Sequence, residues 1–265
     1  FKSRQWGRAI AIHELAPNLS FLLAPLICEA LLQWFSWRDV FKALGIAALL
    51  LSVVFAKFGR GGEFKGDPIG YASYGKLLSN PAFWVMVILF SLGISSTMGV
   101  YSMLSLYLVT EHGMARNRAN TLIALSRVAS VGVALAGGWA TDRFGPRRVL
   151  RVVFILTGLM TVFIGLASTS WVTVAVFLQP IMAVCFFPAG LAALSMVSAA
   201  KERNIAVSLT VPLAFMVGGG AAPTFIGFMG DVNSFGSGIA LVGGAIIMGS
   251  IIAGYLRLQD RPDPN

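Results

Sequence analysis

Eight apolar runs, each long enough to cross a lipid bilayer, follow one another along the sequence. They cover residues 10–35, 39–57, 82–108, 119–140, 149–168, 171–199, 204–229 and 235–256. A transmembrane helix needs about 20 mostly apolar residues, because the hydrocarbon core of a bilayer is about 30 Å thick. Runs of this length are helical, since a helix satisfies all of its own backbone polar groups in lipid. The predicted fold class is therefore an all-α membrane protein with eight transmembrane helices.

The composition excludes a soluble protein. Hydrophobic residues make up 57% of the chain and charged residues 12%, whereas a soluble domain carries about 25% charged residues. The 29 glycines suit helices that pack closely in lipid. We therefore expect the lipid bilayer, and not a nucleic acid, to be the main partner of this chain despite its net charge of +9.

Basic residues gather at one set of helix ends. The opposite ends hold three, Arg38, Arg116 and Arg118. This asymmetry predicts that both ends of the chain are cytoplasmic and that the protein is a multi-pass protein, with a bacterial inner membrane favoured by its short, basic loops. The fifteen basic residues on the predicted cytoplasmic side are Lys2, Arg4, Arg8, Lys57, Arg60, Lys65, Lys76, Arg143, Arg147, Arg148, Arg151, Lys201, Arg203, Arg257 and Arg261.

One connection, residues 58–81, is longer than the others and is polar, basic and rich in glycine. It ends in Asn80 and Pro81, which suit the cap and the first turn of the next helix. The chain is therefore predicted to divide into residues 1–57, a cytoplasmic linker at 58–81, and a bundle at 82–265.

A charged motif stands between the fourth and fifth runs, with the sequence Gly138-Trp139-Ala140-Thr141-Asp142-Arg143-Phe144-Gly145-Pro146-Arg147-Arg148. Gly138 permits close helix contact and Gly145 a tight turn. Asp142 can cap a helix end or pair with a cation. The spacing resembles the Gly-x-x-x-Asp-Arg-x-Gly-x-Arg-Arg loop of the major facilitator superfamily, whereas an ordinary positive-inside loop is the alternative.

The resemblance implies an alternating-access transporter built from two bundles of six helices. In that family the loop joins helices two and three and again helices eight and nine. Four runs follow the motif here, so the chain is expected to hold helices five to twelve. Residues 1–57 then form helices five and six of the first bundle, and residues 82–265 form the second bundle. Helices one to four are expected to be needed for a complete transporter.

Arg127 is the leading candidate for substrate binding. It precedes Asp142 by fifteen residues, which places it about 22 Å from the cytoplasmic boundary at 1.5 Å per residue. The family places its substrate near that depth. A buried guanidinium binds carboxylate, nitrate or phosphate in bidentate fashion. The alternatives are an ion pair with Glu29 and a side chain that reaches to the interface.

Further polar residues in the predicted helices are candidates for the cavity wall. Glu29 could carry a coupled proton, because burial raises the pKa of a carboxylate. Ser95-Ser96-Thr97 and Tyr101, near the middle of their helix, could line the cavity or serve helix packing. Gln179, beside Pro180 on a kinked helix, is a possible hydrogen-bonding contact.

The motif residues Gly138, Asp142, Arg143, Gly145, Arg147 and Arg148 are predicted to act in gating. Glu14 stands at the cytoplasmic end of helix five, which meets the eight–nine loop in the family. An Arg143–Glu14 pair would hold the inner gate closed, and a solvated surface pair is the alternative.

The sequence offers no enzyme site. Its two histidines, His13 and His112, stand far from any metal-ligand cluster, and no Walker loop or nucleophile elbow is present. We expect no cofactor. The predicted function is secondary transport of a small organic or inorganic anion, with a proton as a possible second substrate. The alternatives are a drug or metabolite exporter of the same fold and an inert fragment that lacks helices one to four.

Overall fold

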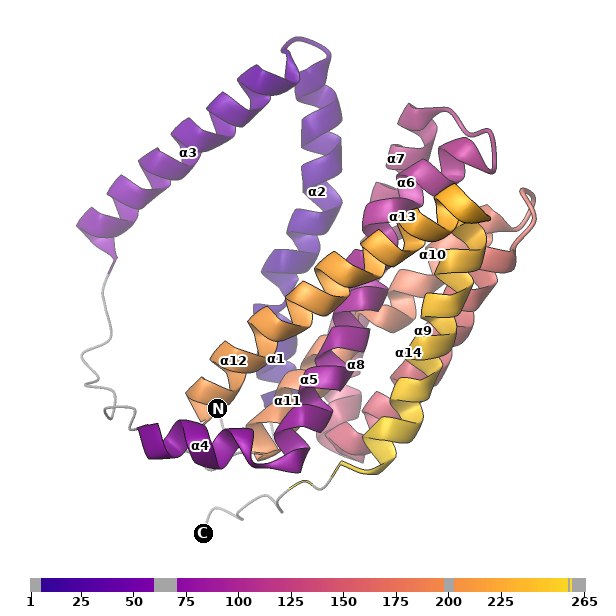
Figure 1. Cartoon of the computed structure of the whole chain (residues 1–265). Helices are drawn as coiled ribbons and strands as arrows, with labels where there is room; N and C mark the ends of the chain where they lie inside the picture. The colour runs from indigo at the N-terminus through magenta and orange to yellow at the C-terminus, as the bar shows by residue number, and fades with distance from the viewer. Residues whose placement is uncertain (1–5, 60–70, 198–202, 257, 259–265) are drawn as a thin grey trace.

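The computed structural model describes residues 6–59, 71–197, 203–256 and 258, and all of the regular structure within them is helical (Figure 1). Two short stretches are π-helical and interrupt longer α-helices. The elements are α1 (Trp6–His13), α2 (Leu15–Leu32), α3 (Trp37–Phe58), α4 (Tyr71–Leu78), α5 (Pro81–Ile94), η2 (Ser95–Gly99), α6 (Val100–Thr110), α7 (Arg116–Ser126), α8 (Val128–Phe144), α9 (Pro146–Leu166), α10 (Val172–Ala183), α11 (Phe186–Val197), α12 (Arg203–Phe215), η3 (Met216–Ala221), α13 (Ala222–Val232) and α14 (Phe235–Gly254).

Joined end to end, these elements form eight segments long and apolar enough to cross a membrane within the described residues. They are Arg8–Leu32, Trp37–Phe58, Pro81–Thr110, Arg116–Phe144, Pro146–Leu166, Val172–Val197, Asn204–Val232 and Phe235–Gly254. The prediction of eight transmembrane helices is confirmed. The largest boundary difference is at α8, which continues into the charged motif as far as Phe144 instead of ending at residue 140.

Helices α5 to α14 form a tightly packed bundle. Its longest contact lies between α9 and α14, which run side by side. Glycines permit this approach, because a Cβ on Gly158 would lie 2.8 Å from the Gly243 carbonyl oxygen and one on Gly243 would lie 2.6 Å from the Val162 nitrogen. Small residues allow helices to pack closely in lipid, where the hydrophobic effect does not drive helices together.

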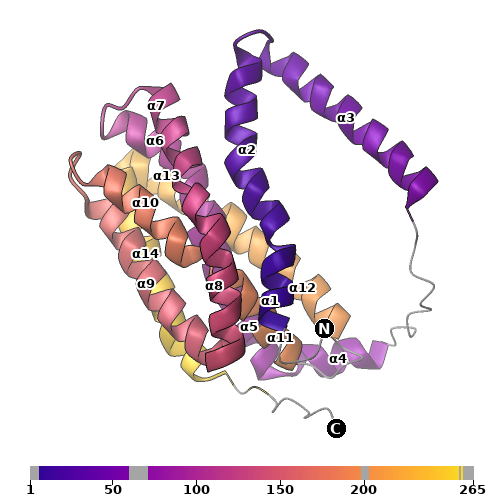
Figure 2. The ribbon, with the colours of Figure 1, turned by 180° about the vertical axis from the view of Figure 1, so that it is seen from behind.

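The first two helices lie against this bundle. Helix α1 packs on α8 and α11, and α2 packs on α7 and α8. Helix α3 packs on α2 and leans away from the bundle (Figures 1 and 2). Its apolar side chains are exposed, as in Leu50 at 63% and Phe55 at 75%. Such a surface requires lipid or further helices around it.

The predicted linker contains a helix that the sequence analysis did not predict. Helix α4 lies within residues 58–81 and is followed directly by α5. The predicted cap is confirmed, because Asn80 Oδ1 accepts a hydrogen bond from the Ala82 N–H at 3.0 Å and Pro81 is the first residue of α5. Residues 60–70 of the linker lie outside the described residues, and the division into domains stays a prediction.

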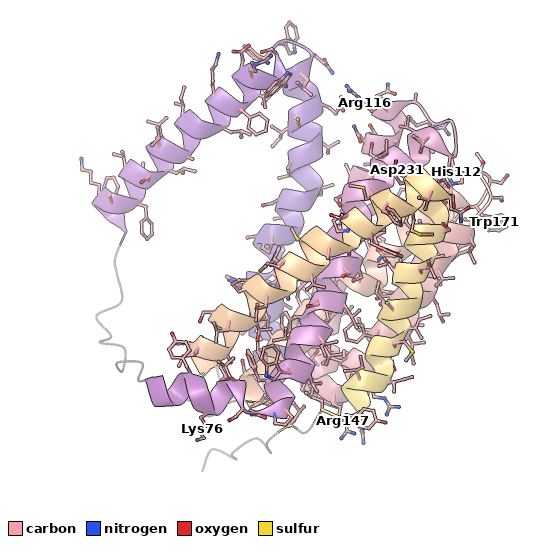
Figure 3. All side chains as sticks on the ribbon, viewed as in Figure 1. Lys76, His112, Arg116, Arg147, Trp171 and Asp231 are labelled. Atoms are coloured by element: carbon pink, nitrogen blue, oxygen red, sulfur yellow. The ribbon has the colours of Figure 1, made fainter. Side chains whose placement is uncertain are left out.

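The two ends of the bundle carry different charged groups. Figure 3 shows Lys76 and Arg147 at one end and Arg116, His112 and Asp231 at the other. The helix ends therefore separate as predicted, while their assignment to the cytoplasm stays a prediction. Seven of the fifteen basic residues lie outside the described residues: Lys2, Arg4, Arg60, Lys65, Lys201, Arg257 and Arg261.

Candidate functional site

Four of the transmembrane segments are interrupted near their middle. The π-helical turns η2 and η3 interrupt the third and seventh segments. The fourth segment breaks at Arg127, between α7 and α8, and the sixth breaks between α10 and α11. Irregular backbone at membrane depth is tolerated where it is buried in protein or lines a cavity, because its polar groups need partners. These interruptions mark where a site can form.

The η2 turn supplies two backbone acceptors. The Thr97 carbonyl accepts a hydrogen bond from Arg127 Nη2 at 2.8 Å. The Ser96 carbonyl accepts one from Gln179 Nε2 at 2.9 Å. Wider π-helical turns disturb the regular ladder of backbone hydrogen bonds, and they occur often at functional sites. The segment therefore connects the third, fourth and sixth transmembrane segments through its main chain.

Arg127 sits at the break between α7 and α8. Its own N–H bonds to the Ala124 carbonyl at 3.1 Å, a spacing of three residues that tightens the chain there. The side chain is buried, with 7% exposed, and its guanidinium lies 3.9 Å from the centre of the Tyr101 ring. Stacking on Tyr101 and the bond to Thr97 orient the guanidinium plane.

Arg127 and Tyr101 both line a cavity of about 450 Å³, which is large enough for a small organic molecule. The structure thus brings these two predicted binding residues together. The apolar part of the wall was not predicted from the sequence, although Ile123 precedes Arg127 by one helical turn and shares its face. The wall consists of Thr97, Met98, Tyr101, Ser102, Ile123, Arg127, Phe215 and Gly219.

Ser95 and Gln179, the other predicted binding residues, do not line this cavity. Ser95 Oγ donates to the Ser91 carbonyl at 2.7 Å within its own helix. Gln179 is fully buried, and its Nε2 also lies 3.2 Å from Thr161 Oγ1. Its Oε1 has no hydrogen-bond partner among the described residues. The structure places Gln179 as a connection between helices, and a substrate contact for either residue stays a prediction.

Glu29 lies in α2 and faces α7. Its Oε1 accepts a hydrogen bond from Asn120 Nδ2 at 2.9 Å, and Asn120 Oδ1 accepts one from Ser105 Oγ at 2.7 Å. Asn120 precedes Arg127 by seven residues, or about 10 Å along the helix. The chain of hydrogen bonds joins α2, α7 and α6. A proton-carrying role for Glu29 and an ion pair with Arg127 stay predictions.

The charged motif turns the chain between α8 and α9. Gly145 has φ +83°, a backbone conformation that L side chains rarely adopt, so the predicted tight turn is present. Gly138 is buried, and its neighbour Gly137 also packs closely, since a Cβ there would lie 2.9 Å from Cys185 Sγ; the packing role of Gly138 stays a prediction. Arg147 donates to the Gly254 carbonyl and so joins the start of α9 to the end of α14.

Asp142 connects the motif to α1. It accepts a hydrogen bond from the Arg8 N–H at 3.2 Å, and Arg8 Nε lies 3.8 Å from the same carboxylate oxygen. The motif and α1 therefore contact each other through Asp142 and Arg8. Arg143 lies over Trp139, 5.5 Å from the ring centre. Glu14 is buried at the break between α1 and α2, and its pairing with Arg143 stays a prediction.

Solved structures share the fold of this chain. The chain resembles the transporter FucP in its outward conformation, with a TM-score of 0.67 and 16% identity over 87% of this chain and 60% of that one. A second structure, of the Escherichia coli fucose:proton symporter FucP, matches equally well over 61% of its chain. At this identity the likeness concerns the fold alone.

Related sequences are transporters. A probable L-galactonate transporter of Escherichia coli (strain K12) is 22% identical across the whole chain, which spans 64% of that relative. A Na⁺, Li⁺, K⁺/H⁺ antiporter of Planococcus maritimus is 26% identical over 54% of this chain and 32% of its own. The chain therefore spans less than two-thirds of the relatives that it matches.

The family profile agrees with these matches. The profile described as Major Facilitator Superfamily matches residues 1–137 and, in a second alignment, residues 102–265. Membership supports the prediction of a multi-pass membrane protein that is not an enzyme. The family match covers the whole chain and agrees with its eight helical segments, so the chain belongs to the Major Facilitator Superfamily.

Proposed function

We propose that this chain forms the larger part of a secondary transporter for a small hydroxylated carboxylate, working by alternating access. The observation that carries the proposal is Arg127, a buried guanidinium at a helix break that lines a cavity of about 450 Å³. A charge at membrane depth is expensive and is retained where it serves a function or a partner. A carboxylate is the anion whose two oxygens best match a guanidinium fork.

The remaining wall suits a substrate with both polar and apolar faces. Ser102 provides a hydroxyl group, while Met98, Ile123 and Phe215 provide apolar surface. The name of the Escherichia coli relative refers to L-galactonate, a sugar acid with one carboxylate and several hydroxyls. The fold match to a fucose symporter concerns a sugar that lacks this charge. Arg127 favours the acid over the neutral sugar.

The transporting unit is proposed to include helices one to four and to be coupled to protons through Glu29. The share of the Escherichia coli relative that the chain spans supports the first part. Glu29 contacts Asn120 across the interface between α2 and α7, where a change of protonation would alter that contact. The inner membrane, with both ends of this chain cytoplasmic, is the proposed location.

The test uses the protein with helices one to four in proteoliposomes. Uptake of L-galactonate, gluconate and lactate is compared with uptake of fucose, with and without a pH gradient. We expect the acids to be transported and Arg127→Gln to reduce their uptake by about ten- to a hundredfold, as expected for a lost hydrogen bond to a charged group. The variant should keep the thermal stability of the unmodified protein.

A different outcome would favour the exporter. If none of the acids is taken up and Arg127→Gln only lowers thermal stability, then Arg127 has a structural role. The Glu29→Gln variant tests the coupling separately, because it should transport without responding to the pH gradient. A gradient response that persists in this variant would place proton coupling elsewhere.

A further inference from the structure

A second cavity lies on the opposite side of α8 from α1. It is a groove between α8 and α9 with a volume of about 480 Å³. Figure 2 shows α8 and α9 side by side, with α1 on the other flank of α8. The groove is closed at its base by Met182 and Cys185, at the break between α10 and α11. It is separate from the cavity of Arg127, with which it shares no residue.

Small and apolar side chains form almost the whole groove. From α8 come Ala136, Gly137 and Ala140, and from α9 come Val152 and Leu156. Val152 and Leu156 are exposed, at 54% and 39%, so the groove opens at the surface of the bundle. A hydrocarbon chain is the chemical group that matches such a lining in a membrane protein.

One charged residue, Arg148, lines the groove at its end. It is exposed and lies in the first turn of α9. Arg143 and Arg151 are exposed nearby on the same two helices. A groove with an apolar body and a basic mouth is complementary to a lipid with an anionic headgroup.

The length of the groove agrees with one leaflet of a bilayer. On α9 it extends from Arg148 to Leu156, and on α8 from Phe144 to Ala136. Each stretch rises by eight residues, or about 12 Å. Half of the hydrocarbon core measures about 15 Å. A lipid whose headgroup contacts Arg148 can therefore place an acyl chain along the groove.

We propose that the α8–α9 groove binds an anionic phospholipid of the adjacent leaflet, with Arg148 holding the phosphate and the Ala136–Ala140 wall holding one acyl chain. This role is independent of the transported substrate. It assigns Arg148 a contact with lipid in addition to its place in the motif.

Native mass spectrometry of the purified chain in mild detergent tests the proposal. Equal amounts of dioleoylphosphatidylglycerol and dioleoylphosphatidylcholine are added, and the ratio of the bound lipids is measured. The anionic lipid should predominate. Arg148→Gln should lower the ratio about fivefold, the effect of one basic residue near a membrane surface. Arg148→Lys should retain most of it.

Matched variants distinguish lipid binding in the groove from a general attraction between basic residues and anionic lipids. Arg151→Gln removes an equal charge three residues away, outside the groove, and should leave most of the ratio intact. Ala136→Phe should lower binding of both lipids, whereas Ala129→Phe, at an exposed position of α8 outside the groove, should not. Equal binding of the two lipids, equal losses in Arg148→Gln and Arg151→Gln, or unchanged binding in Ala136→Phe would each overturn the proposal.

Discussion

At the scale of single residues, the contacts of Arg127 define the candidate site. The guanidinium is held between a ring face and a backbone carbonyl, and both belong to one transmembrane segment. Tyr101 also donates from its hydroxyl to the Val176 carbonyl of α10 at 3.4 Å. The ring therefore positions Arg127 and contacts a third helix at the same time.

Under the proposed function, Tyr101→Leu should weaken binding of L-galactonate by about 1 kcal/mol, because it removes the aromatic face beneath the cation. Tyr101→Phe keeps that face and should bind nearly as well as the unmodified protein. Competition against a radiolabelled substrate measures the binding affinity of both variants. Equal losses in the two variants would mean that the hydroxyl, and not the ring, supports the site.

His112, in the loop between α6 and α7, predicts a pH dependence of stability. Burial lowers its pKa below the ordinary value of about 6.5, while the charge of Glu111 acts in the opposite direction. The ring packs edge-on to Tyr107, and Nδ1 lies 3.1 Å from Thr169 Oγ1. The folded state therefore favours the neutral ring.

A group with a depressed folded-state pKa contributes stability above its unfolded pKa and loses it as the pH falls through the folded value. Thermal unfolding between pH 8 and about pH 5 should show this loss. His112→Gln should reduce this pH dependence, because it removes the titrating ring. Identical pH profiles for the unmodified chain and His112→Gln would contradict the assignment.

At the scale of elements, η2 and η3 cross where both helices are interrupted. A Cβ on Gly99 would approach Ala222 Cβ to 3.1 Å, and a Cβ on Gly218 would lie 2.6 Å from the Ser91 carbonyl oxygen. The two backbones touch there, so neither glycine has room for a side chain. The crossing lies beside the cavity, to which Thr97 and Gly219 contribute.

Gly218→Ala should destabilise the bundle by about 1–3 kcal/mol, the usual cost of overpacking. Gly219→Ala is the matched control, because its nearest neighbour, a carbon of Phe215, lies 3.5 Å away. It should be neutral or stabilising by about 0.5–1 kcal/mol. Thermal unfolding in detergent compares the two, and equal stabilities would disprove the close crossing.

At the scale of the whole molecule, polar contacts near both ends of α1 and α2 join these helices to the second bundle. Arg8 contacts Asp142 near one end, and Glu29 contacts Asn120 toward the other. In the proposed alternating-access mechanism such contacts open and close in turn, so each contact would bias the equilibrium between conformations.

Asp142→Asn should weaken the contact between α1 and α8 by about 1 kcal/mol, since it removes the charge that faces Arg8. Spin labels at the exposed positions Ile12 and Val152 would measure the distance between α1 and α9. In Asp142→Asn a larger share of molecules should show a long distance between the two labels. Asp231→Asn, at the opposite end in Figure 3, should leave the distribution unchanged. An unaltered distance distribution in Asp142→Asn would show that the contact between Arg8 and Asp142 does not influence the conformation.

The sequence by itself determined the membrane fold, the eight helices and the charged turn. Each depends on local chemistry: the length of an apolar run, the φ that Gly145 adopts, and the cap that Asn80 supplies. The sequence also marked Arg127 as a candidate binding residue, because a charged residue within an apolar run can be recognised without coordinates. The interruption at Arg127 was not predictable, since neither proline nor glycine stands beside it.

Only the tertiary structure decided which polar groups meet. Gln179 and Ser95 appeared equivalent to Tyr101 as polar residues at mid-depth, yet only Tyr101 faces the cavity. Asp142 contacts Arg8, and Glu29 contacts Asn120. Partners of this kind lie more than ninety residues apart, so their choice depends on how the interrupted helices rotate and pack. Neither composition nor helical periodicity contains that information.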